Sequence, residues 1–191
     1  MIRSISVFLL LVASASVSAQ QSAHDYSFLQ ASYSKVDAGS SLDDGDGLGV
    51  SLSYGLTPNF HIFGGYLGID TNSNVDAGGW RAGIGLNTPL SQQLDIVVRL
   101  SYQTTERPAP GPGGGSVDDD GLAFGAGVRA AVNNRIELYG GLNYIDLDSG
   151  NETVLDAGFL FSLNRAFALG VSTTWDDDVS AWSLDGRLYF E

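Results

Sequence analysis

The sequence has no cysteine, only one lysine, and no apolar stretch long enough to cross a membrane as a helix. Without cysteine, an exported form of the chain has no disulfide and depends on backbone hydrogen bonds and packing. A helical span needs about 20 apolar residues, whereas the strongest apolar run covers only residues 7–12. These absences exclude a disulfide-stapled secreted domain and a helical membrane protein.

Positive charge is scarce throughout the chain. Nine Lys and Arg residues stand against 22 Asp and Glu, which gives a formal net charge of −13. Binding to nucleic acid depends on clustered Lys and Arg, so nucleic acid is excluded as a partner. We also identify no cofactor-binding motif.

The first 19 residues have the pattern of a secretory leader. Arg3 precedes the apolar run 7–12, and Val17, Ser18 and Ala19 supply the small residues of a cleavage site. We therefore expect a signal peptide at 1–19 and a single domain at 20–191.

Two-residue alternation of apolar side chains recurs along the domain and predicts an all-β protein. Leu48, Val50, Leu52, Tyr54 and Leu56 give one of the clearest examples. Each predicted strand has about the nine to eleven residues of a tilted transmembrane strand. The ten predicted strands lie near 26–36, 47–56, 60–70, 78–88, 93–104, 121–132, 136–146, 153–163, 167–175 and 179–190.

The connections alternate between short turns and longer acidic segments, which is the pattern of an antiparallel up-and-down transmembrane barrel. We expect ten strands, with eight as the alternative, and the alternation at 60–70 is weak. A soluble lipocalin-like barrel has the same period, but its outer face would carry many Lys and Glu. This chain has one Lys and four Glu, and its polar strand positions are mostly Gly, Ser and Ala. Small residues of this kind suit a narrow lumen.

The leader, the acidic loops, the short turns and the ending from Trp182 to Phe190 resemble the small outer-membrane β-barrel superfamily of Gram-negative bacteria, which includes opacity-type and OmpA-like barrels. The resemblance implies the cell outer membrane, with both termini in the periplasm. It also implies outer-membrane lipid and lipopolysaccharide as surroundings, and recognition of the C-terminal aromatic strand by the barrel-assembly machinery. The final aromatic residue here is penultimate, since Glu191 follows it.

The predicted register directs four cations and four anions into the lumen. Across the hairpin at 133–135, Arg129 and Glu137 are expected to be diagonal cross-strand neighbours, close enough for their side chains to meet. One interpretation is a salt-bridged network that fills the lumen, since unpaired charge is costly in a narrow interior. The other is a charged constriction that selects solutes. The network comprises Arg81, Arg99, Arg129, Arg187, Asp95, Glu137, Asp156 and Asp185.

The acidic segments are a second candidate site. Asp43, Asp44 and Asp46 provide oxygen ligands of the kind that bind calcium or magnesium, although the stretch lacks the closing glutamate of an EF-hand. The alternative is a solvated rim that keeps the loops soluble. The longest predicted loop, 105–120, is rich in Pro and Gly and suggests an exposed recognition surface.

An enzyme is not expected. The two histidines, His24 and His61, both lie near predicted periplasmic turns, so no base is available for a Ser-His-Asp site at the outer rim. We expect a structural, adhesion or surface-interaction protein with a plugged lumen. The alternative is a narrow channel for ions or small solutes.

Overall fold

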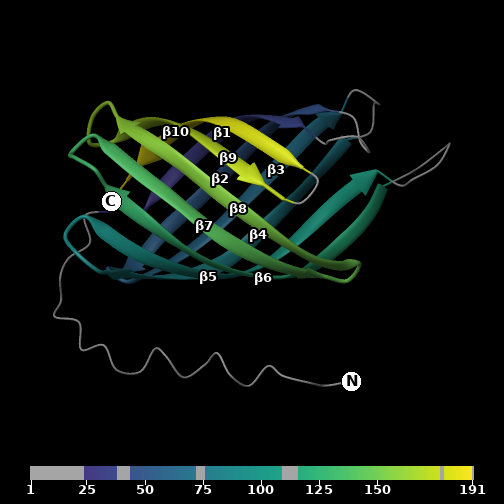
Figure 1. Cartoon of the computed structure of the whole chain (residues 1–191), viewed down its shortest axis with the longest axis horizontal. Helices are drawn as coiled ribbons and strands as arrows, with labels where there is room; N and C mark the ends of the chain where they lie inside the picture. Colours follow the sequence, from purple (N-terminus) through teal and green to yellow (C-terminus); the bar gives the residue numbers. More distant parts are fainter. Residues whose placement is uncertain (1–23, 38–43, 72–75, 109–115, 177–178, 191) are drawn as a thin grey trace, which may run out of the picture.

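The protein is a closed barrel of ten antiparallel strands joined in sequence order, with β1 hydrogen-bonded to β10 (Figure 1). The computed structural model describes residues 24–37, 44–71, 76–108, 116–176 and 179–190. The predicted fold class and strand number are therefore confirmed, and the eight-stranded alternative is wrong. The strands are β1 (Phe28–Asp37), β2 (Gly45–Thr57), β3 (Phe60–Thr71), β4 (Asp76–Pro89), β5 (Leu94–Pro108), β6 (Ser116–Ala131), β7 (Ile136–Leu147), β8 (Gly150–Ser162), β9 (Phe167–Trp175) and β10 (Ser180–Tyr189). Within the described ranges, no helix is long and apolar enough to cross a membrane.

The alternation in the sequence sorts side chains onto the two faces of the barrel wall. Large apolar residues such as Leu48, Leu52 and Ile84 face outward and are 71%, 50% and 44% exposed. An apolar outer surface is the surface that lipid covers. Many of the inward-facing positions of β2, β4 and β6 are glycines. They leave room for the larger inward side chains of neighbouring strands.

The wall extends further than the sequence predicted around the longest connection. Much of 105–120 was expected to be a loop, but β5 runs to Pro108 and β6 begins at Ser116. Thr105 pairs with Asp119 and Glu106 with Asp118 across this extension. The hydrogen bonds of a ladder join backbone groups, so the pairing continues although the side chains there are polar.

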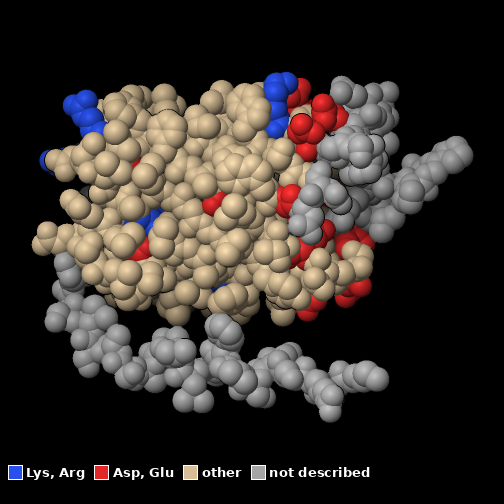
Figure 2. Space-filling view, viewed as in Figure 1, with Lys and Arg blue, Asp and Glu red and all other residues tan. Residues whose placement is uncertain are grey.

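The two ends of the barrel differ in their connections and charge. The short turns after β2, β4, β6 and β8 lie at the same end as the start of β1 and the finish of β10, and we call this the turn end. At two of these turns, Asn133 and Asn164 accept backbone hydrogen bonds through their side-chain oxygens. Asp and Glu side chains gather at the opposite end, which we call the acidic end (right in Figure 2).

Outward-facing aromatic rings lie mostly toward the acidic end. All three tryptophans, Trp80, Trp175 and Trp182, are exposed there, and the ring centroids of Trp80 and Tyr102 are 5.7 Å apart. Amphipathic rings of this type favour the boundary between lipid and water. The ring positions therefore indicate where the bilayer surface crosses this end of the wall.

Candidate functional site

The eight ionisable residues predicted for the lumen all lie at inward-facing positions, but they fall into different environments. Asp95, Arg129, Asp185 and Arg187 are buried, while Glu137, Asp156 and Arg99 are half-buried. Arg81 is exposed, and it lines a cavity inside the barrel. The ionisable side chains of the lumen therefore differ in their exposure.

The first cluster lies at the turn end, where the side chains of His24 and Tyr26, in the segment that precedes β1, are buried. Arg129 on β6 donates to both carboxylate oxygens of Glu137 on β7, at 2.7 and 3.0 Å. His24 Nδ1 lies 3.0 Å from the same carboxylate. The Arg129 guanidinium also donates to the backbone carbonyl of Asp25, at 3.0 Å. One ion pair across a hairpin thus holds the N-terminal segment in place.

Tyr26 is the centre of this segment and is buried. Its hydroxyl donates to Asp95 on β5 at 2.9 Å, and its ring stacks on His61 of β3 with 4.7 Å between centroids. The Arg129 guanidinium carbon lies 4.5 Å from the centroid of the Tyr26 ring. Residues of β3, β5, β6 and β7 therefore contact the side chains of His24 and Tyr26, although the segment that carries these two residues is not part of the sheet.

A second cluster joins the seam between β1 and β10. Arg187 donates to the side-chain oxygen of Gln30 at 2.8 and 2.6 Å, and its guanidinium lies 4.0 Å over the ring of Phe28. Asp185 accepts hydrogen bonds from Ser32 at 2.7 Å and from Ser172 at 2.8 Å. These side chains lie in the lumen beside the strand pair that closes the barrel.

Bulky inward side chains lie over glycines on the neighbouring strand. His61 is the direct cross-strand partner of Gly85, Asn143 of Gly125 and Tyr139 of Gly158. A Cβ atom added at any of these glycines would meet the partner's side chain. The alternating glycines in the sequence therefore provide the space that the polar lumen residues occupy.

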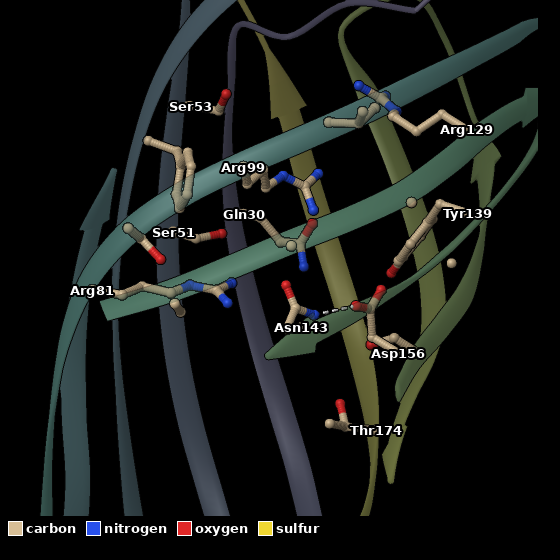
Figure 3. Close-up of a pocket in the computed structure, with 18 of the residues that line it drawn as sticks. Gln30, Ser51, Ser53, Arg81, Arg99, Arg129, Tyr139, Asn143, Asp156 and Thr174 are labelled. Carbon is tan, nitrogen blue, oxygen red and sulfur yellow. Dashed lines mark hydrogen bonds between the residues drawn. The ribbon is translucent and has the colours of Figure 1, made fainter. Parts of the chain in front are cut away.

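Between the two clusters lies a cavity of about 290 Å³. Figure 3 shows Arg81 and Arg99 reaching into it from β4 and β5, with Asn143 and Asp156 on the opposite wall. Asn143 donates to Asp156 at 2.8 Å. Within the described part of the chain, no hydrogen bond or ion pair reaches the side chain of Arg81 or Arg99.

The predicted cation site at the acidic end is only partly described. Asp43 lies outside the described residues. Asp46 accepts from Lys35 at 2.7 Å and from the Tyr33 hydroxyl at 3.0 Å, so its carboxylate binds side chains of β1. Among the described residues, no group of three or more His, Asp or Glu side chains is arranged to hold a metal ion.

We predicted a strand from residue 26, whereas β1 begins at Phe28, and the burial of His24 and Tyr26 inside the lumen was not predicted. A pattern for it does exist in the sequence. His24, Tyr26, Phe28 and Gln30 alternate with the same parity, and Phe28 and Gln30 are the inward positions of β1. When polar and aromatic residues continue the two-residue alternation of the inward-facing positions beyond the end of a strand, they therefore indicate a segment that follows the inner wall.

Comparisons with known proteins agree with this architecture. No curated protein matches the chain. The solved structure of the KdgM porin in complex with disordered oligogalacturonate has 9% identity and a TM-score of 0.52, covering 86% of this chain and 99% of that one. The N-terminal β-barrel domain of Pseudomonas aeruginosa OprF has 11% identity and a TM-score of 0.49, covering 86% of this chain and 100% of that one. The model of the outer membrane protein beta-barrel domain matches residues 5–174, so the chain belongs to this family of outer-membrane barrels.

Proposed function

We propose that this protein is a structural or surface-interaction barrel whose lumen is plugged at the turn end, and that it is not an enzyme. The observation that carries this proposal is the N-terminal segment in the lumen, with His24 and Tyr26 buried against Glu137, Asp95 and His61. Small barrels of eight to ten strands are filled mostly by their own side chains. A segment bound across the mouth leaves the acidic end as the part that meets partners.

The proposed orientation has both termini and the short turns in the periplasm, and the acidic end outside the cell. Short periplasmic turns and longer outer loops are the usual arrangement in this class of barrel. The acidic end then faces the phosphates of lipopolysaccharide, and divalent cations would bridge the two anionic surfaces. The outward-facing residues Leu188 and Phe190 near the C-terminus would be contacted by the barrel-assembly machinery during insertion.

Planar-bilayer recording of the refolded protein tests the plug. We expect the folded wild-type barrel, recognised by its heat-modifiable gel shift, to insert without discrete conductance steps. The double variant His24→Ala with Tyr26→Ala should conduct, because the contacts that hold the segment over the mouth are lost. The exposed turn substitution Asn134→Ala is the matched control and should remain silent. Wild-type steps of the same size as those of the double variant would overturn the plug.

A narrow channel is the second candidate, and the cavity with Arg81 and Arg99 favours it. Charged side chains that line a constriction select among ions. This candidate predicts discrete steps from the wild-type protein that change in size or selectivity when Arg99 is replaced by alanine. If the wild-type protein gives conductance steps and the Arg99 substitution changes them, the channel replaces the plug as the proposed function.

A further inference from the structure

We infer that the cavity in the middle of the barrel binds a small oxyanion, a carboxylate, phosphate or sulfate group, through Arg81 and Arg99. This goes beyond the proposed structural role and does not depend on whether the turn end is closed. The residues that line the cavity come from strands on every side of the barrel, so the cavity lies inside it.

The first observation is the contrast between two pairs of lumen arginines. Arg129 is bound to Glu137 and Arg187 to Gln30, each through two hydrogen bonds. Within the described ranges, Arg81 and Arg99 have no such partner. Their guanidinium groups keep hydrogen-bond donors directed at the cavity (Figure 3). A planar guanidinium has paired donors whose geometry matches an oxyanion.

The second observation is the charge balance of the cavity. Its lining includes four arginines and one carboxylate, that of Asp156. The charge of Asp156 acts on both Arg81 and Arg99, but a single carboxylate balances only one of them. Glu137 balances Arg129 and does not line the cavity. Asp95 and Asp185 also lie in the lumen, but they do not line the cavity, and their carboxylates accept from Tyr26 and from Ser32 and Ser172. The excess of positive charge is therefore local to the cavity lining, where it attracts an anion and repels a cation.

The third observation is the neutral part of the lining and its size. Hydroxyl and amide side chains of Ser51, Ser101, Gln103 and Thr174 line the same space. They supply hydrogen bonds to the remaining oxygen atoms of a ligand. A volume of about 290 Å³ is just under the usual range for ligand pockets, roughly 300 to 1,000 Å³. This size suits a small ligand group.

Isothermal titration calorimetry on the full chain refolded in detergent micelles tests the site with three probes at constant ionic strength. Sodium acetate represents a carboxylate, and sodium sulfate and inorganic phosphate represent tetrahedral oxyanions. We expect saturable binding of at least one probe to the wild-type barrel. Tighter binding of acetate than of the tetrahedral oxyanions, or the reverse, supports the site and identifies the kind of group that it accepts.

Substitutions at the two arginines locate the binding. Arg81→Ala and Arg99→Ala should each weaken it at least tenfold, and Arg81→Lys, which keeps the charge but loses the planar fork, should weaken it less than Arg81→Ala. Arg165→Ala removes an equal charge from an exposed turn and should leave the affinity unchanged. The lysine variant also provides a test if the alanine variant does not fold. The inference is overturned if the wild type binds none of the probes, or if Arg165→Ala weakens binding as much as the lumen substitutions. Because binding is measured in micelles, a conducting wild-type barrel would overturn the plug without affecting this result.

Discussion

At the residue scale, the lumen is built from pairs in which a large polar or aromatic side chain lies over a glycine. The His61 ring occupies the space beside Gly85, and the same ring stacks on Tyr26. A methyl group at position 85 would therefore disturb two contacts at once. Burial of His61, which is only 2% exposed, leaves the ring little freedom to move away.

Gly85→Ala should consequently destabilise the barrel by about 1–3 kcal/mol, the usual effect of overpacking an interior. Urea unfolding of the protein in lipid vesicles measures this change. Gly64→Ala is the matched control, because Gly64 faces outward and a Cβ there would meet one backbone oxygen, at 3.4 Å. Its free energy of unfolding should stay close to that of the wild type. Combining Gly85→Ala with His61→Ala should restore part of the loss, since the added methyl then has room. An equal effect of the two glycine substitutions would show that the ring does not require the glycine.

The sequence predicted which ionisable residues face the lumen, because the period of two assigns a face to every strand position. Of their partners it indicates only the pair that shares a hairpin, Arg129 and Glu137, which are diagonal cross-strand neighbours and do form an ion pair. Arg129 and Glu137 lie on one hairpin and are near each other in sequence, whereas His24 and Glu137 are separated by 113 residues. A contact of the second kind depends on the closure of the whole barrel, which no local pattern encodes.

At the scale of the elements, strand lengths and turns could be predicted well except where polar residues continue a ladder. The extension of β5 and β6 carries Thr105, Glu106 and Asp118, and none of these has the apolar alternation that indicates a strand. Backbone pairing with the neighbouring strand is what keeps this hairpin extended. The side-chain pattern alone therefore underestimates the length of the strands in a hairpin that extends beyond the apolar belt.

The two kinds of connection predict opposite accessibility in cells. The natural chain has no cysteine, so a single introduced thiol is unambiguous. Asp148→Cys lies in the turn between β7 and β8 at the acidic end, and Arg165→Cys lies in a turn at the other end. A membrane-impermeant maleimide should label position 148 in intact cells and position 165 only after the outer membrane is permeabilised. Labelling of position 165 alone in intact cells would reverse the proposed orientation.

At the scale of the whole molecule, the distribution of apolar side chains is the reverse of that in a soluble protein, because the large ones lie on the outside of the barrel. Most of the large hydrophobic residues are more than a third exposed, and few are buried in the lumen. Stability in this arrangement comes from the closed backbone ladder and from the lipid that covers the outer wall. The depth of a residue in the bilayer should therefore decide how well the wall tolerates a charge.

Ile84 and Leu48 test this dependence on depth. Ile84 faces outward near the middle of β4, whereas Leu48 faces outward beside Asp46 at the acidic end. Ile84→Arg should cost about 2–4 kcal/mol and Leu48→Arg about 0–1 kcal/mol, as expected for the midplane and the interface. Urea unfolding in vesicles gives both values. Equal costs at the two positions would mean that the bilayer does not cover the wall as its apolar belt indicates.

The N-terminal segment has a further consequence for how the molecule is made. Its partners are His61, Asp95, Arg129 and Glu137, which come from β3, β5, β6 and β7. These four strands surround one space only in the closed barrel, so the contacts of the segment require closure. An incompletely assembled chain would leave residues 24–27 outside the lumen and open to proteolysis. The same few residues would thereby distinguish a finished barrel, which resists cleavage there, from an incomplete chain, which does not.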